Sequence, residues 1–140
     1  MRLSASTVFV VITAGALLLA AACTGDDDNG GPDAPFTTVE EPAQIVSVDL
    51  RVAESLPPQY FVGIVSEQSN GCTRFSRHEV RRDRTEIHID VWNTVPRDPE
   101  TVCTLVYSTT ETNVALGTDF ESGTQYTLSV NGQSQTFVAQ

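Results

Sequence analysis

The side chains that could act as nucleophiles, general bases or metal ligands are few in this sequence. His78 and His88 are the two histidines, and both fall among Arg and Glu residues in segments that alternate apolar and polar side chains. The G-x-S-x-G pattern of a serine nucleophile is absent. No histidine follows Cys103, as the copper sites of small β-sandwiches would require. We therefore predict no catalytic residue, no bound metal and no cofactor.

One short segment concentrates the positive charge of the chain. It holds five of the eight basic residues, all of them arginines: Arg74, Arg77, Arg81, Arg82 and Arg84. Arginine forms paired hydrogen bonds with carboxylates and phosphates, so the segment could dock lipid headgroups, wall polymers or an acidic partner. Alternatively, Glu79, Asp83 and Glu86 balance these charges across a solvated hairpin, which also protects a strand edge from pairing. The sequence leaves both interpretations open.

Trp92 is the single tryptophan and falls on the polar side of its strand pattern, with His88 and Asp90. An exposed tryptophan beside polar groups could serve as a platform for a sugar or a partner protein. The other interpretation is that a loop or an edge of the fold covers the ring. Trp92 and the five arginines are therefore the candidate binding residues.

The balance of charge restricts the partners of the chain. There are 18 acidic residues against 8 basic ones, which gives a formal net charge of −10. Such a charge disfavours non-specific binding to nucleic acid, and it also disfavours attraction to an anionic membrane.

The first 22 residues have the layout of an export signal. Arg2 precedes an apolar run from Val8 to Ala22, and small residues, Ala20 to Ala22, come directly before Cys23. As a helix the run would span only about 22 Å, which is short of a bilayer core. The segment resembles a bacterial lipoprotein signal, which implies that Cys23 becomes an acylated N-terminus and anchors an extracytoplasmic protein to a membrane. An ordinary secretory signal is the alternative.

The two remaining cysteines predict a disulfide, because Cys72 and Cys103 form an even pair in an exported chain. The bond would join different strands, the third and the fifth of those predicted below. Closing a loop of that length stabilises the fold by about 3 to 4 kcal/mol in the chain-entropy description.

Residues 23–43 predict an acidic, disordered tether. The segment Thr24 to Ala43 has six carboxylates, no basic residue and three prolines, so it buries too little apolar surface to offset its chain entropy. We expect the tether to hold the folded domain, residues 44–140, off the membrane.

Alternation of apolar and polar residues predicts about seven strands in that domain. The first has Val46, Val48, Leu50 and Val52 on its inner face, the inner face of the second is ambiguous, the third has a bulge, and the fifth is broken near 109–112. The strands are expected at 46–52, 60–66, 72–81, 86–92, 102–116, 126–130 and 133–139. No segment has a helical period.

The last two strands form the best-specified hairpin. Asn131-Gly132 supplies the two positive-φ residues of a type I′ turn. Before the hairpin, the spacing Phe120-x-x-Gly123-x-x-Tyr126 resembles the tyrosine corner of immunoglobulin-like and fibronectin type III sandwiches. The resemblance implies an all-β, Ig-like antiparallel β-sandwich in which the Tyr126 hydroxyl binds nearby backbone.

These observations together predict a non-catalytic, lipid-anchored binding or interaction module of the bacterial cell envelope. Its partners would be the membrane, through the anchor, and an envelope protein or an anionic wall or lipid component. The oligomeric state does not follow from the sequence. The alternative function is a surface protease inhibitor that presents the loop from Pro96 to Glu100 or the loop from Leu56 to Gln59.

Overall fold

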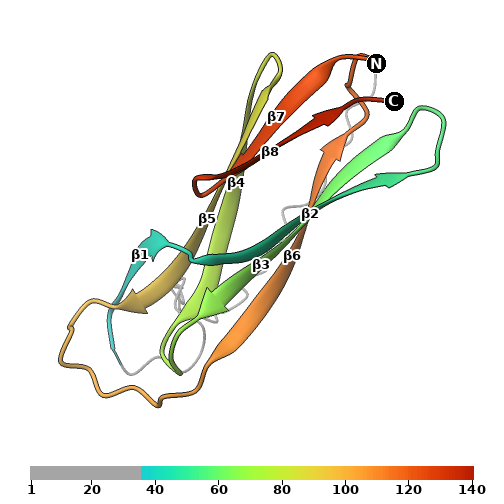
Figure 1. Cartoon of the computed structure of the whole chain (residues 1–140). Coiled ribbons are helices and arrows are strands. Elements are labelled where there is room, and N and C mark those ends of the chain that lie inside the picture. The colour runs from blue at the N-terminus through green and yellow to red at the C-terminus, as the bar shows by residue number, and fades with distance from the viewer. Residues whose placement is uncertain (1–35) are drawn as a thin grey trace, which may run out of the picture.

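The computed structural model describes residues 36–140 and shows two β-sheets packed face to face (Figure 1). Helices are absent from this range. The predicted signal, Cys23 and the first part of the tether lie outside the described residues. Eight strands are present: β1 Thr38–Pro42, β2 Ile45–Ala53, β3 Gln59–Gln68, β4 Arg74–Asp83, β5 Glu86–Pro96, β6 Ser108–Gly117, β7 Gln125–Val130 and β8 Gln133–Val138. The all-β fold class is confirmed, with one strand more than expected.

The larger sheet is built around β5. One edge of β5 pairs with β4, and its other edge pairs first with β7 and then, further along, with β1. The β7–β8 hairpin completes the five strands. All strand pairs within residues 36–140 are antiparallel except β5 with β7, which run parallel.

Strand β1 lies inside the segment predicted to be a tether, so the start of the fold at residue 44 is wrong. Thr38 to Pro42 pair with β5, and Ala43 is only 4% exposed. The Ala43 amide donates to the Val91 carbonyl at 2.9 Å. This pairing gives the short acidic strand the backbone partners and the buried contact that its composition did not predict.

The smaller sheet has the order β2-β3-β6. In β3 the ambiguity is resolved, because Tyr60, Val62 and Ile64 point into the core and Phe61 and Val65 do not. In β2 the predicted inner face is only partly correct. A bulge between Ile45 and Ser47 turns Val46 outward, to 52% exposure, while Val48 and Leu50 pack against the core. Val52 is also exposed, beyond the edge of the core.

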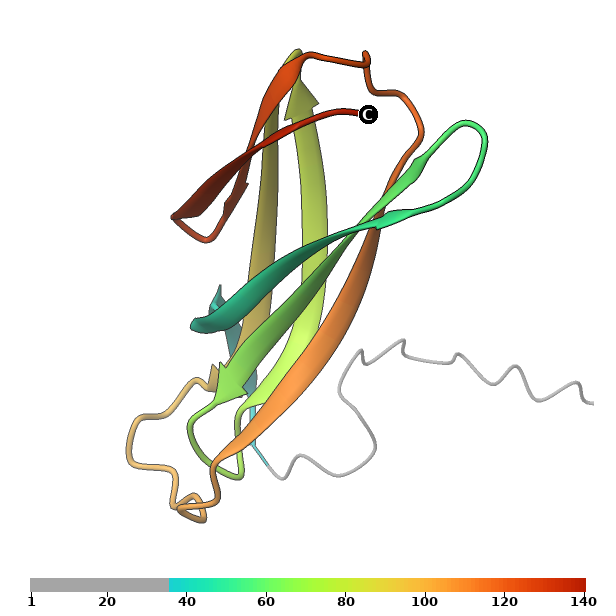
Figure 2. The same cartoon turned by 45° about the vertical axis from the view of Figure 1, so that its right-hand side comes forward.

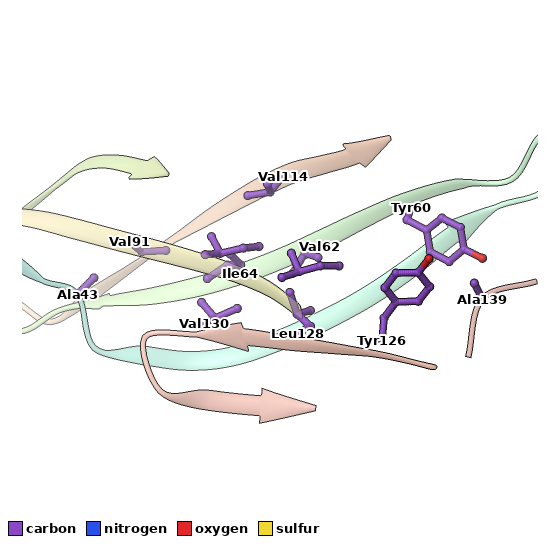
Figure 3. Packing of buried hydrophobic residues seen from close by; sticks show 12 residues of the cluster. Ala43, Tyr60, Val62, Ile64, Val91, Val114, Tyr126, Leu128, Val130 and Ala139 are labelled. Atoms are coloured by element: carbon purple, nitrogen blue, oxygen red, sulfur yellow. The ribbon is translucent and has the colours of Figure 1, made fainter. Parts of the chain in front are cut away.

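The core lies between the two sheets (Figure 3). Aliphatic side chains fill its centre, and the rings of Tyr60 and Tyr126 close one end. Its buried apolar members are Ala43, Tyr60, Val62, Ile64, Ile87, Ile89, Val91, Val114, Tyr126, Leu128, Val130 and Ala139. The buried polar residues are Ser66, Gln68, Thr73 and Asn93, and the Asn93 amide donates to the Glu67 carbonyl of the facing sheet at 2.8 Å.

The break predicted near 109–112 is wrong. Strand β6 runs without interruption from Ser108 to Gly117, and its register with β3 is regular through this region. The irregular part lies earlier, since residues 101–107 form a loop with no strand pairing.

The predicted disulfide is confirmed, although it does not join two strands. Cys72 lies in the turn before β4, and Cys103 lies in the loop before β6, with a Cα–Cα distance of 5.6 Å. The bond therefore fastens the loop 101–107 to the turn between β3 and β4. A backbone hydrogen bond from Gly71 to the Thr104 carbonyl, 2.8 Å long, reinforces this contact. A Cβ atom at Gly71 would lie 2.0 Å from the Thr104 hydroxyl oxygen and 3.3 Å from the Thr104 Cβ, so a larger residue here would require the Thr104 side chain to move.

The tyrosine corner is present. The Glu121 amide donates to the Tyr126 hydroxyl at 3.0 Å, and Gly123 has the positive φ of 82° that the corner requires. The Phe120 ring packs edge-on against Tyr126, with 5.0 Å between ring centroids.

We expect Tyr126→Phe to reduce the free energy of unfolding by about 1 kcal/mol, because the Glu121 amide loses its acceptor while the ring packing is retained. Urea unfolding of the purified protein measures the change. The matched control is Tyr107→Phe, at an exposed tyrosine, which should leave the midpoint unchanged. Equal midpoints for both variants would show that the hydroxyl of Tyr126 contributes nothing.

The β7–β8 turn is confirmed as type I′ in its two positive-φ residues, Asn131 at 44° and Gly132 at 90°. The Asn131 side chain also does more than close the turn. Its amide donates to the carbonyls of Ala43 at 2.7 Å and Val91 at 2.9 Å, and its oxygen accepts from the Val91 amide at 2.9 Å. Because the β5–β7 ladder stops at Val130, this side chain extends the ladder by one position and ties it to the chain that leaves β1.

Candidate interaction surface

The outward face of β4 and β5 gathers three of the five candidate arginines with Trp92. Strand register places Arg77 opposite Trp92, Arg81 opposite His88 and Arg74 opposite Thr94. These partners alternate with the buried Ile89, Val91 and Asn93 of β5, so all three arginines point away from the core. We call this surface, formed by Arg74, Arg77, Arg81 and Trp92, the arginine face.

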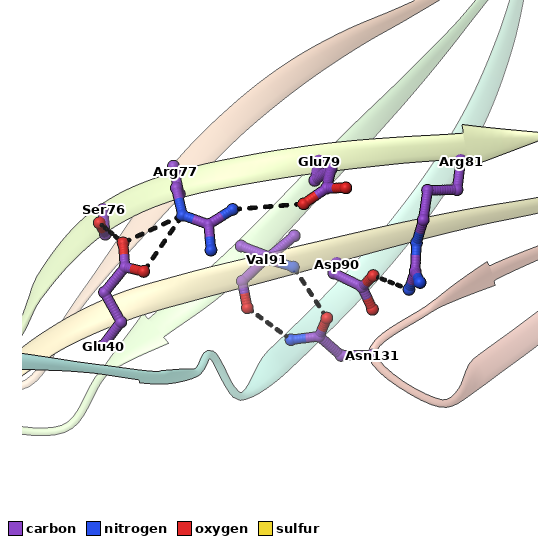
Figure 4. Close-up of polar contacts among 8 residues, drawn as sticks. All are labelled: Glu40, Ser76, Arg77, Glu79, Arg81, Asp90, Val91 and Asn131. Atoms are coloured by element: carbon purple, nitrogen blue, oxygen red, sulfur yellow. Dashed lines mark hydrogen bonds and ion pairs between the residues drawn. The ribbon is translucent and has the colours of Figure 1, made fainter.

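Arg77 is the best-anchored member of the arginine face (Figure 4). Its guanidinium carbon lies 3.8 Å from the centroid of the Trp92 ring. Its Nε is 3.1 Å from the carboxylate of Glu40 on β1, and its Nη1 is 3.5 Å from Glu79. Arg77 therefore links three strands of the larger sheet, and its cation–π contact holds the ring.

Glu40 is held in its ionised form by its neighbours. A hydrogen bond from the Ser76 hydroxyl is the largest cause that lowers the pKa of Glu40, and the Arg77 guanidinium lowers it further, against a smaller opposing effect of desolvation. A lowered folded pKa means that the contribution of Glu40 to stability is present above its ordinary pKa of 4.5 and is lost as the pH falls through the folded value.

We expect Ser76→Ala to raise the pKa of Glu40 back toward its ordinary value of 4.5, because the carboxylate loses its hydroxyl donor. An NMR titration of the Glu40 side chain in the two proteins measures the shift. An identical titration in the two proteins would show that Ser76 does not donate to Glu40 in solution.

The other arginines have separate environments. Arg81 forms an ion pair with Asp90. Arg82 points to the opposite side of β4, where its guanidinium carbon lies 4.0 Å from the centroid of the Phe120 ring. Arg84 occupies the tip of the β4–β5 hairpin with a φ of 52°, and Arg74 donates to the Thr73 carbonyl at 2.8 Å. The five arginines therefore do not form one surface.

Trp92 is half-buried. It is therefore neither the exposed platform nor the fully covered ring that the sequence left open. Pro42 of β1 lies opposite it on one side and Arg77 of β4 on the other. The Arg77 guanidinium thus covers part of the Trp92 ring, which is not left free as a platform.

Since Trp92 is the single tryptophan, its fluorescence reports on the arginine face. We expect Arg77→Ala to shift the emission to longer wavelength and to increase quenching by acrylamide, because the ring loses its cover. Arg81→Ala is the control, since Arg81 pairs with Asp90 and has no contact with the ring among those described. Equal spectra for the wild type and Arg77→Ala would exclude the stacked geometry.

The two histidines point to opposite sides of the larger sheet. His78 pairs with the buried Val91, whereas His88 pairs with Arg81 on the outward face. They cannot bind one metal ion or one substrate together. Within residues 36–140 no group of His, Cys, Asp and Glu side chains has the arrangement of a metal site, and this part of the chain contains no helix able to cross a membrane.

The loop before β6 exposes apolar side chains that were not predicted to be exposed. Val102 and Leu105 are each 96% exposed, and Val106 and Tyr107 are more than half exposed. We call residues 102–107 the apolar loop. The signal for it was available, because Leu105-Val106-Tyr107 is a run of apolar residues without the alternation of a half-buried strand.

The opposite end of the molecule carries another strongly exposed apolar side chain. Leu56, in the loop between β2 and β3, is fully exposed beside an open pocket. The pocket is lined by Val52, Ala53, Glu54, Ser55, Leu56, Pro58 and Gln140.

Two sheets with a shared core, a tyrosine corner and a disulfide outside the core define a β-sandwich domain. The chain belongs to the ORF11 beta-sandwich domain family, which it matches over residues 62–139. The match covers the fold from the middle of β3 to the end of β8. No curated protein and no solved structure matches the chain.

Proposed function

We propose that this protein is a lipid-anchored, extracytoplasmic interaction module of the bacterial cell envelope and that it performs no catalysis. Two observations support the proposal. Small residues precede Cys23 at the end of a segment with the layout of an export signal, and a disulfide, which is typical of exported proteins, joins Cys72 to Cys103.

The arginine face is the proposed binding surface, and the observation that carries this choice is its set of exposed, exchangeable ion pairs. The side chains of Arg77 and Arg81 are 47% and 63% exposed. Pairs this exposed contribute about 0 to 1 kcal/mol, so a carboxylate or phosphate from a partner can replace Glu40, Glu79 or Asp90 at little cost. Arg74 has no carboxylate partner among residues 36–140 and can accept an anion directly.

The test compares the binding of unlipidated protein to isolated cell envelopes at low and high salt. The change Cys23→Ser removes the anchor from both proteins that are compared. One of them also has the triple change Arg74→Ser, Arg81→Ser and Arg84→Ser, which removes positive charge from the arginine face and from the adjacent hairpin tip. Arg82 is left in place, because it packs on Phe120. We expect at least about tenfold weaker binding at low salt, and little binding by either protein at high salt.

The control for this test is Arg51→Ser with Arg97→Ser, which removes two positive charges where the triple change removes three. Arg51 lies on the smaller sheet, where it pairs with Asp49 and Glu111, and Arg97 follows β5. These changes also remove positive charge but leave the arginine face intact. If the control loses as much binding as the triple variant, the attraction is one of total charge, and the assignment to the arginine face is wrong.

The Leu56 loop favours a second candidate, a protease inhibitor. Leu56 is fully exposed and is followed by two prolines, which is a suitable presentation of an apolar side chain to a protease pocket. Inhibition of a panel of proteases by the unlipidated protein, abolished by Leu56→Asp, would support this candidate. The absence of inhibition across the panel would remove it.

A further inference from the structure

The apolar loop and the N-terminal entry of the chain lie at the same end of the sandwich. The Arg97 amide donates to the Thr37 carbonyl at 2.9 Å, and Thr38 pairs with Pro96 at the point where β5 leads into the loop. Figures 1 and 2 both show the first described residues and the β5–β6 connection at one end, with the β2–β3 loop at the other. The segment that would lead to the anchor therefore enters beside the apolar loop.

The apolar loop is fastened at its base while its side chains remain outside the core. The Cys72–Cys103 bond and the Gly71–Thr104 hydrogen bond hold its backbone against the β3–β4 turn. Val102, Leu105, Val106 and Tyr107 nevertheless stay exposed. A restrained loop loses less conformational freedom when it enters an apolar environment, so the attachment favours binding. Tyrosine also suits the boundary between water and lipid, since its ring is apolar and its hydroxyl is polar.

We infer that the apolar loop inserts into the lipid bilayer and sets the protein upright on the membrane. This inference depends on the proposed anchor at Cys23. Thirteen residues lie between Cys23 and Thr37, and the tether predicted from their composition would have an end-to-end distance of about 20 Å. The loop is therefore within reach of the surface, whereas the Leu56 end lies farther away by about the length of β3, roughly 30 Å. The arginine face is left on the side of the domain, accessible to a partner.

The negative charge of the protein indicates which kind of lipid surface the apolar loop would bind. Asp98 and Glu100 lie just before the apolar loop, and the chain as a whole has a net charge of −10. Attraction to anionic headgroups cannot drive the contact. The loop therefore binds through its apolar side chains, and the surface that it fits best is a zwitterionic bilayer.

The test measures which end of the protein enters the bilayer, from the quenching of tryptophan emission by brominated lipid. The acylated full-length mature protein is reconstituted into phosphatidylcholine vesicles whose acyl chains carry bromine, a quencher of tryptophan. Two variants share the change Trp92→Phe, which removes the native tryptophan. One adds Tyr107→Trp in the apolar loop, and the other adds Leu56→Trp at the opposite end, where the side chain is fully exposed. We expect a blue shift and a loss of emission for the Tyr107→Trp protein and no change for the Leu56→Trp protein.

A further pair of changes separates insertion from mere proximity. Adding Leu105→Ser and Val106→Ser to the Tyr107→Trp protein should restore its emission, while thermal unfolding stays unchanged because both side chains are exposed. Equal quenching of the two tryptophan variants, or no quenching of either, would overturn the inference. Protection of the loop in native envelopes but not in pure lipid would also overturn it, by assigning the loop to a protein partner.

The mass of the protein before reconstitution tells the two proposals apart. An unacylated Cys23 would contradict the proposed anchor. An acylated protein whose Tyr107→Trp variant is not quenched would contradict the membrane contact of the loop alone.

Discussion

Replacing Cys72 and Cys103 together with alanine should lower the free energy of unfolding by about 3 to 4 kcal/mol. The bond spans 31 positions, and its loss frees the unfolded chain to adopt many more conformations. For a domain with a total stability of about 5 to 15 kcal/mol, this is a large fraction. Urea unfolding measures the change, and reduction of the wild-type protein should reproduce most of it.

The control for this prediction is Cys23→Ser, which should leave the unfolding midpoint of the protein unchanged. Hydrogen exchange adds a local measurement. The Gly71 amide, which binds the Thr104 carbonyl, should exchange faster in the double alanine variant because the loop is no longer held against the turn. An unfolding midpoint equal to that of the wild type would show that the bond does not form in solution.

Asn131→Ala should be as damaging, with an expected loss of about 3 to 4 kcal/mol in the free energy of unfolding. Three hydrogen bonds to the backbone of Ala43 and Val91 disappear, each with a net value of about 1 kcal/mol. The positive φ of 44° adds about 1 kcal/mol, because alanine adopts this conformation less readily than asparagine. The segment between β1 and β2 should also lose protection from hydrogen exchange, since the Ala43 carbonyl loses its donor.

Asn131→Gly separates the two causes. Glycine tolerates the positive φ, so this variant should lose only the hydrogen bonds and be about 1 kcal/mol more stable than Asn131→Ala. If Asn131→Gly were as stable as the wild type, the side-chain bonds would contribute nothing, and the residue would serve the turn alone.

Local patterns were enough to predict most of the strands. Ile87, Ile89 and Val91 alternate with polar residues and are all buried, and Asn131-Gly132 form the expected turn. The disulfide followed from the cysteine count and the predicted export signal, and the corner followed from the spacing around Tyr126. The strands, the turn and the corner depend on short stretches of sequence, so one sequence carries enough information to predict them.

The incorrect predictions concern features that depend on pairing between distant segments of the chain. Strand β1 has the composition of a tether, with Glu40, Glu41 and Pro42, and becomes a strand only because β5 supplies its partners. The parallel pairing of β5 with β7 depends on the path of the whole chain between them. Val46 is exposed because of a bulge, which is set by the backbone bonds of β2 with β3 rather than by the pattern of side chains.

The arginine face likewise could not be predicted fully, because it depends on the position of a bulge. A regular strand would place Arg74 and Arg77 on opposite faces, since they are three residues apart. The bulge between Phe75 and Arg77 brings both outward, and it leaves Arg82 on the other side, against Phe120. The sequence predicted a bulge in this strand but not its position, so it could not show which arginines share a face.

The most direct measurement is mass spectrometry of the N-terminal peptide of the protein recovered from the membranes of its own cells. The proposed anchor predicts a peptide that begins at Cys23 and carries a lipid on the cysteine sulfur, and a Cys23→Ser protein that is released from the membrane fraction. A mature chain that begins elsewhere, or one that begins at Cys23 without lipid, would contradict the anchored module and with it the membrane contact of the apolar loop.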